Sequence, residues 1–376
     1  MNFTISEEQQ SAQQLAQQIL SDFTEVDKLK AIEQQESFDA GLWQALAKAG
    51  LLGLDIAEDQ GGTGLGFYSL TTLCEEVGRT VAPVPIIPVL VSAAGTLRRF
   101  ASDTQKDQWL PGIASGATLI GAALEEYNND DPMTPSCSAQ KLEGGYSISG
   151  TKICVSEAHS TSRILLSAHT GDELVVALID PCAAGVTLNP QLVSTGETRH
   201  ELVMTKVQVP TEDIVATGSD AVAAMDWAHL ATRTALAAVA VGLCDKMMRI
   251  TGQYTSEREQ FGRPIATFQA VSHRVADCYI DVECLRLVTQ QAASLIDEGH
   301  PAKDAVQIAK IWCGNVTHRV SQAAQHCHGG TGVDRDYPLF RYCQWARQIE
   351  LTSGSSAQLI GELGQTICAE YLSKTG

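Results

Sequence analysis

The chain has 376 residues, of which 44% are hydrophobic and 19% charged, and its net charge is −18. This length is sufficient for two or three domains, and the composition is typical of a soluble globular protein. The acidic balance repels phosphate backbones and anionic lipids, which argues against a nucleic acid or a membrane surface as partner. Apolar runs such as 235–241 are shorter than the roughly 20 residues of a transmembrane helix, and no secretory signal is visible. We therefore expect a cytoplasmic protein.

Eleven cysteines are present, without any C-x-x-C pair. Several lie within helical apolar stripes, where a free thiol behaves as a small hydrophobic side chain. The stretch His326-Cys327-His328 resembles a metal cluster, but alternating residues at a helix end point apart and no fourth ligand is near in the sequence. We expect reduced, mostly buried cysteines and no metal site.

The first part of the chain, residues 1–115, is predicted to be helical. Ser6 and Gln9 form a plausible capping box for an amphipathic helix that extends through residue 20. A glycine-rich loop then precedes a further helix over about 68–79.

The pattern changes in residues 116–222, which we predict to form a small β domain. Short apolar runs, such as 164–166 and 174–179, are separated by turn residues at short intervals. The polar, proline-containing stretch 128–136 is predicted to be a loop within this domain.

Helical periodicity returns in residues 223–376. Apolar residues between 271 and 295 recur at spacings of three and four, which predicts a long helix suited to a bundle or a subunit interface. Pro301 marks the start of its successor.

Three segments, in this order, carry a family resemblance. They are Gly50–Leu54 leading into Gly61–Gly66 and Glu75–Arg79, then Arg258–Ile265 with Phe268 and Gln269, and finally His328–Gly332 through Asp336–Leu339 to Arg341. With the α–β–α order, they resemble the acyl-CoA dehydrogenase superfamily over essentially the whole chain. The resemblance implies an α+β multidomain fold with an N-terminal helical domain, a middle β-barrel-like domain and a C-terminal four-helix bundle, assembled as a dimer of dimers.

The resemblance also implies an FAD cofactor. Arginine can form charge-assisted bonds to a pyrophosphate, and glycines allow close approach of the backbone to an anion. In the family, the R-x-x-F-G and G-G-x-G segments reach across the dimer to the ADP half of the FAD held by the neighbouring subunit. The implied cofactor positions are Arg258, Phe261, Gln269, His326, Gly329, Gly330 and Ser156. Taken alone, Arg258 could equally be a solvated or capping arginine, and His326 a structural histidine.

The catalytic base departs from the family pattern. Dehydrogenation requires a carboxylate that removes the α-proton of the acyl group. Ser353 stands at the glutamate position used by most members, and Thr232 stands at the alternative position, beside Arg233. The resemblance implies that Arg233 contacts the substrate. Glu350 is a displaced candidate base or, alternatively, a solvated glutamate near a helix end.

The flavin-contacting residues of the middle domain also depart from the family. Glu125 stands where a neutral donor normally meets the flavin and would repel a reduced anionic flavin. Cys154 replaces the tryptophan that stacks on the ring, although Ser156 can still donate a hydrogen bond to flavin N5.

The segment from Gly332 to Leu351 resembles the glutamate-lacking subunit of the heteromeric α2β2 acyl-CoA dehydrogenases with which bacteria degrade steroid side chains. It implies an enzyme subunit with an acyl-CoA substrate, a homologous subunit that supplies the glutamate, and an electron-transfer flavoprotein or similar acceptor. Two alternatives stay open: a self-sufficient homotetrameric dehydrogenase with a displaced base, and a non-catalytic acyl-CoA-binding or scaffold paralogue. A flavin oxidase or monooxygenase is disfavoured, since neither base position holds aspartate or histidine.

Overall fold

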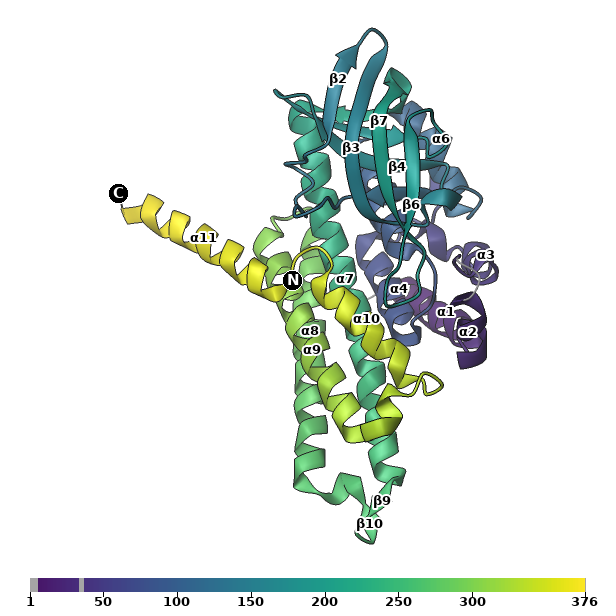
Figure 1. The fold of residues 1–376 in the computed structure, drawn as a ribbon, viewed down its shortest axis with the longest axis vertical. Coiled ribbons are helices and arrows are strands. Elements are labelled where there is room, and N and C mark those ends of the chain that lie inside the picture. The colour runs from purple at the N-terminus through teal and green to yellow at the C-terminus, as the bar shows by residue number, and fades with distance from the viewer. Residues whose placement is uncertain (1–5, 34–36, 376) are drawn as a thin grey trace.

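The computed structural model describes residues 6–33 and 37–375, and shows helices, a sheet and a helical bundle in chain order (Figure 1). The N-terminal helices are α1 (Glu7–Phe23), α2 (Val26–Glu33), α3 (Ala40–Lys48), α4 (Gly66–Thr80), η3 (Ile87–Ala94), α5 (Gly95–Phe100) and α6 (Asp103–Ala114), with short turns η1 (Leu51–Gly53) and η2 (Glu58–Gln60). The C-terminal helices are α7 (Gly218–Glu257), α8 (Gln269–Asp297), α9 (Lys303–His328), η7 (Gly329–Val333), α10 (Leu339–Leu351) and α11 (Ser356–Thr375). The predicted fold class is confirmed.

Local sequence signals account for several of these elements. The Ser6 side chain accepts the Gln9 backbone N–H, and the Gln9 side chain accepts the Ser6 N–H, so the predicted capping box opens α1. The predicted long helix with its heptad-like stripe is α8, and its successor α9 begins just after Pro301.

The middle domain is one eight-stranded sheet in the order β6-β7-β3-β2-β4-β5-β8, with β1 paired to β4 in parallel. Its strands are β1 (Ile120–Ala123), β2 (Ser138–Leu142), β3 (Gly145–Ser156), β4 (Arg163–His169), β5 (Leu174–Ile179), β6 (Val186–Gln191), β7 (Arg199–Pro210) and β8 (Ile214–Thr217), with turns η4 (Ala158–Ser160) and η5 (Thr211–Asp213). The apolar run 174–179 is the fully buried strand β5, as predicted. The C-terminal ends of β1 and β3 lie beside α10 and the turn at Ser353.

Helix α7 is the longest element, with 40 residues, which corresponds to about 60 Å at 1.5 Å per residue. By length and composition alone it could cross a membrane, but 89% of its most apolar 18-residue stretch is buried inside the fold. It packs against α4, α8, α9 and α10. Beyond its C-terminus, β9 (Glu259–Gln260), β10 (Arg263–Pro264) and η6 (Ile265–Thr267) form the far end of the bundle (Figure 1).

Two glycines let α4 and α7 pack with their backbones in close contact. A Cβ atom added at Gly242 would lie 1.8 Å from the carbonyl oxygen of Glu75, and one added at Gly78 would lie 2.0 Å from the carbonyl oxygen of Val239. Real Cβ atoms do not approach backbone atoms so closely, so any larger residue would force the helices apart. The contact between the first and last domains therefore depends on glycine at both positions.

We expect Gly242→Ala to lower the free energy of unfolding by about 1–3 kcal/mol, because overpacking outweighs the better helix propensity of alanine. Gly252→Ala on the same helix is the control. A Cβ at Gly252 meets nothing within 4 Å, so that change should be neutral or stabilise by up to about 1 kcal/mol. Chemical denaturation of both variants checks this, and equal stability of the two would contradict it.

Candidate functional site

A cavity of about 180 Å³ lies where the three domains meet, beside the free ends of β1 and β3. It is lined by Ile87, Pro88, Ser92, Ala122, Leu124, Glu125, Ile153, Cys154, Val193, Arg199, Thr232, Leu236, Gln348, Thr352 and Ser353. Ser353 and Thr232, the residues at the two expected base positions, thus face the same cavity although they are far apart in the sequence. The structure brings them together with Glu125 and Cys154.

Thr232 is buried, and its hydroxyl lies 2.7 Å from the hydroxyl of Ser92 on η3. Segment η3 has π-helical geometry, which is frequent at functional sites. Sequence reasoning missed Ser92 and this segment; Pro88 at its start is the only local signal that could have drawn attention to it.

Charged groups from three elements hold the turn that contains Ser353. Ser353 has a φ of 55°, which is uncommon for a residue with a side chain. The Arg233 Nε atom donates to the Ser353 carbonyl at 2.9 Å, and Lys310 Nζ donates to the Ile349 carbonyl at 3.0 Å. The Ser353 N–H donates to Glu125 Oε1 at 3.1 Å. The turn is therefore positioned through backbone contacts, independently of the side chain at position 353.

The buried Arg233 side chain, expected to contact substrate, also lies 3.8 Å from Glu362. Burial lowers the pKa of Arg233, partly offset by nearby carboxylates. Its role toward substrate stays a prediction, because in the described structure its contacts are to the turn and to α11.

The carboxyl group of Glu125 projects into the cavity. Burial raises its pKa, whereas the bond from the Ser353 N–H lowers it. Glu350 lies elsewhere: its carboxylate is 2.7 Å from Arg347 and 3.4 Å from His318, and it does not line the cavity.

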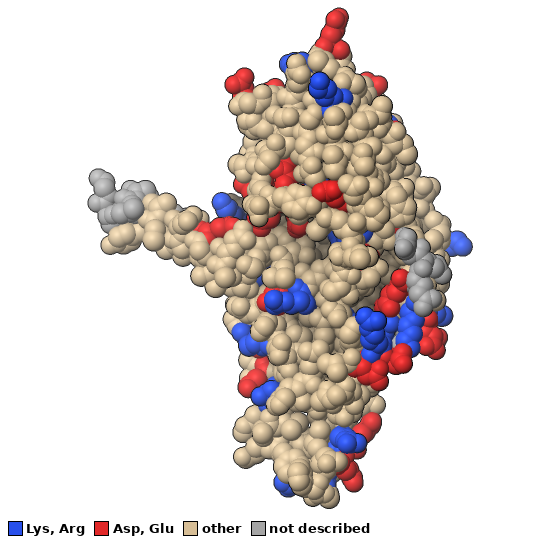
Figure 2. All heavy atoms as spheres, viewed as in Figure 1, with Lys and Arg blue, Asp and Glu red and all other residues tan. Residues whose placement is uncertain are grey.

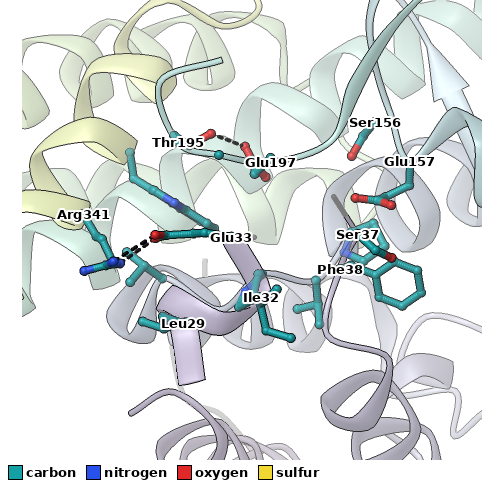
Figure 3. A pocket seen from close by; sticks show the side chains of 16 residues that line it. Leu29, Ile32, Glu33, Ser37, Phe38, Ser156, Glu157, Thr195, Glu197 and Arg341 are labelled. Atoms are coloured by element: carbon teal, nitrogen blue, oxygen red, sulfur yellow. Dashed lines mark hydrogen bonds and ion pairs between the residues drawn. The ribbon is translucent and has the colours of Figure 1, made fainter. Parts of the chain in front are cut away.

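Two smaller cavities, of about 70 and 40 Å³, lie next to it: Arg199 lines the first of them together with the 180 Å³ cavity, and Ser156 lines both of the smaller ones. Figure 3 shows the smaller of these, with Glu157 and Ser156 on one side and Glu197 beside Thr195. We call the three neighbouring cavities, from Ser353 to Glu157, the crevice. Ser156 is therefore placed along the crevice, where the resemblance put the flavin.

The remaining predicted cofactor residues gather at the far end of the bundle. Arg258, Phe261, Gln269, His326, Gly329 and Gly330 are all exposed there. The ring of Tyr254 stacks on His328 with centroids 4.2 Å apart, which joins the end of α7 to the end of α9. An added Cβ at Gly329 or Gly330 would meet nothing within 4 Å, so the surface above these glycines is open.

Arg274 is a residue of this end that sequence reasoning missed. Its guanidinium lies 2.7 Å from His326 Nδ1. Arg263 stacks over Phe268 with 4.1 Å to the ring centroid, and Phe261 is 92% exposed. Basic groups, an open aromatic face and unobstructed glycines together suit a ligand that carries phosphates and an aromatic ring.

The crevice and the bundle end are far apart. Thr232 lies on α7 and Arg258 is the residue that caps its C-terminus, roughly 39 Å further along the helix axis.

His328, in the histidine-cysteine stretch considered as a metal cluster, has structural contacts. Its Nδ1 pairs with the Ala324 carbonyl at 2.8 Å, and its Nε2 with the Tyr337 hydroxyl at 3.2 Å. Within residues 6–33 and 37–375 no group of three potential metal ligands occurs.

On the face drawn in Figure 2, basic and acidic side chains lie interspersed.

Comparison with known proteins gives the family. Residues 6–117 match the acyl-CoA dehydrogenase N-terminal domain, and residues 222–367 the C-terminal domain. The acyl-CoA dehydrogenase FadE27 of Mycobacterium tuberculosis is 31% identical over 377 residues, covering 98% of this chain and 99% of the relative.

Solved structures agree. A variant of the Tcur3481-Tcur3483 steroid ACAD is 38% identical with a TM-score of 0.92, covering 98% of this chain and 100% of that chain. The ChsE4-ChsE5 complex from Mycobacterium tuberculosis is 30% identical with a TM-score of 0.92, covering 98% and 99%. The FAD complex of PigA, at 22% identity and a TM-score of 0.88, shares the fold. The chain therefore belongs to the acyl-CoA dehydrogenase family of oxidoreductases.

Proposed function

We propose that this chain is a subunit of a FAD-dependent acyl-CoA dehydrogenase, in which a homologous partner supplies the catalytic glutamate. The observation that carries this proposal is the contrast between the two ends of α7. The crevice has hydroxyls at both base positions, Ser353 and Thr232, whereas the bundle end keeps an open, basic surface around Arg258 and Gly329.

A hydroxyl is a poor base for a carbon acid. Removal of the α-proton needs a group whose pKa suits the transfer near neutral pH, normally a carboxylate. The Thr232 hydroxyl pairs with the Ser92 hydroxyl, which cannot activate it. Glu350 is held outside the cavity by Arg347 and His318, which supports the subunit proposal over a displaced base.

The residues at the bundle end suit the ADP half of FAD. We propose that Arg258 and Arg274 neutralise its pyrophosphate, that His326 lies beside them, that Phe261 offers a face to the adenine, and that Gly329 and Gly330 permit close approach. Gln269, at the exposed start of α8, offers an amide. When bound, FAD supplies the acceptor for the hydride that leaves the β-carbon of the acyl group.

The similarity to the Tcur3481-Tcur3483 steroid ACAD and to the ChsE4-ChsE5 complex supports a more specific assignment. We propose a heterotetramer acting on a steroid side-chain CoA thioester, with an electron-transfer flavoprotein or similar acceptor. A cytoplasmic location fits the burial of the apolar α7.

We expect Arg258→Ala to weaken FAD retention by the assembled complex by about 1.5–3 kcal/mol, because it removes a charge-assisted contact to the pyrophosphate. Flavin dissociation from the complex measures this. Lys141→Ala is the matched control, since it removes the same charge from an exposed site on β2, at the opposite end of the molecule. Equal dissociation from the two variants would show that Arg258 does not contact the cofactor.

A second prediction concerns the missing base. The isolated chain should be nearly inactive, because a positioned base contributes roughly 10²–10⁴-fold in rate. In the complex, Ser353→Ala should leave turnover almost unchanged. Steady-state assays with an acyl-CoA and an artificial electron acceptor check both statements. Robust activity of this chain alone, abolished by Glu350→Gln, would instead establish a displaced base.

A further inference from the structure

We infer that the crevice of this chain excludes a flavin, because Gln348 and Glu125 join its two walls by direct hydrogen bonds. The inference rests on the proposed function and deepens it, since it states which of the two chains holds the cofactor ring. One wall is the sheet side, formed by the ends of β1 and β3 and the loop 192–198. The other is the helical side, formed by α10 and the turn at Ser353.

Gln348 makes the first set of bonds across the crevice. Its Nε2 donates to Glu197 Oε2 at 2.6 Å, and its Oε1 lies 2.8 Å from the Thr195 hydroxyl. Both ends of one amide on α10 are thus engaged by the loop of the opposite wall. Arg199 holds Glu197 from behind, with its NH2 at 3.2 Å from the same Oε2, so the acceptor is itself fixed in place.

Glu125 makes the second connection. It follows β1 on the sheet side, and its Oε1 accepts the backbone N–H of Ser353 on the helical side at 3.1 Å. The Ser353 turn cannot easily retreat, because Arg233 holds its carbonyl. The two connections flank the region between Ser353 and Ser156, where the family places the flavin ring.

The dimensions are incompatible with a ring at this position. A planar aromatic ring needs van der Waals contact of about 3.5 Å on each face, so its walls must stand about 7 Å apart. Here polar atoms of the two walls are 2.6–3.1 Å apart at the two connections. The remaining spaces, of about 180, 70 and 40 Å³, are separate cavities.

Charge acts in the same direction. Four carboxyl groups line the crevice, those of Glu33, Glu125, Glu157 and Glu197, against two guanidinium groups, those of Arg199 and Arg341. Glu157 is 4% exposed, and its Oε2 has no hydrogen-bond partner in the described structure. Such a surface is unfavourable to a ligand that carries two phosphates and becomes anionic on reduction. The residues of the crevice therefore do not fit FAD, in contrast to those of the bundle end.

The first experiment opens the crevice. FAD is titrated into the full chain while its fluorescence is followed, for the wild type and for the double variant Glu125→Ala, Gln348→Ala. We expect no saturable binding by the wild type. The double variant should bind FAD saturably, with an affinity at least about tenfold above the highest value compatible with the wild-type titration. Gln344→Ala, on the same helix and outside the crevice lining, should behave as the wild type. A folded double variant that binds FAD no better than the wild type would overturn the inference.

The second experiment fills the crevice and does not depend on the double variant folding. Val193 is half-buried on the loop 192–198 and lines the 180 Å³ cavity. Val193→Trp in the assembled complex should leave the FAD content per complex unchanged, because no ring occupies this crevice. A loss of FAD would show that the hydrogen bonds open to admit the cofactor and would overturn the inference.

The two outcomes separate this inference from the proposed function. If the wild-type chain stays colourless both alone and with its partner, the proposed function fails while the exclusion stands. If the complex is yellow and Val193→Trp removes its FAD, the inference that this crevice excludes a flavin fails, while the proposed subunit role stands. A wild-type chain that is yellow alone and loses its flavin on Val193→Trp refutes both.

Discussion

The length and rigidity of α7 constrain everything else in this molecule. A continuous helix has a fixed rise, so its ends cannot approach one another, and the crevice and the bundle end are held far apart. The backbone contact of Gly242 with α4 fixes the helix relative to the N-terminal domain. The crevice and the bundle end, which correspond to the two parts of a flavin site in the family pattern, are thus separated within one chain. Under the proposed function, that separation is the reason why the bundle end acts on a cofactor held by a second chain.

The crevice departs from the family pattern in its side chains, yet buried basic residues hold the backbone around it in place. Lys310 is fully buried and donates hydrogen bonds to the carbonyls at the end of α10, and Arg233 donates to the carbonyl of Ser353. These contacts use the backbone, so they tolerate any side chain that accepts the local conformation. The space is then occupied by hydrogen bonds between the walls, which satisfy polar groups that would otherwise be buried without partners. Under the inference that no flavin enters, a crevice whose walls are joined by hydrogen bonds is a stable arrangement for this chain.

The sequence was sufficient where the signal is local or where the family motif carries it. The capping box of Ser6, the buried strand 174–179 and the stripe of α8 each follow from neighbouring residues alone. The convergence of Thr232 and Ser353 on one cavity followed from the motifs. The pairing of Ser92 with Thr232, and of Arg274 with His326, could not be predicted, because each joins side chains brought together only by helix packing. Gln348 likewise has no local signal, since its partners lie about 150 residues earlier in the chain.

The same logic explains how catalysis can pass to a partner at little cost to folding. A glutamate at position 353 would place a charge in a largely apolar cavity already lined by Glu125, and like charges at close range raise each other's pKa and oppose burial. Serine removes that penalty, and the turn keeps its φ of 55° through contacts that do not involve the side chain. Serine at position 353 therefore avoids electrostatic strain in this chain. Under our inference that no flavin occupies this crevice, a carboxyl at Glu125 meets no reduced flavin, and it takes the Ser353 N–H as its partner. Under the proposed function, the closed crevice and the exposed basic end both follow from catalysis being divided between two chains.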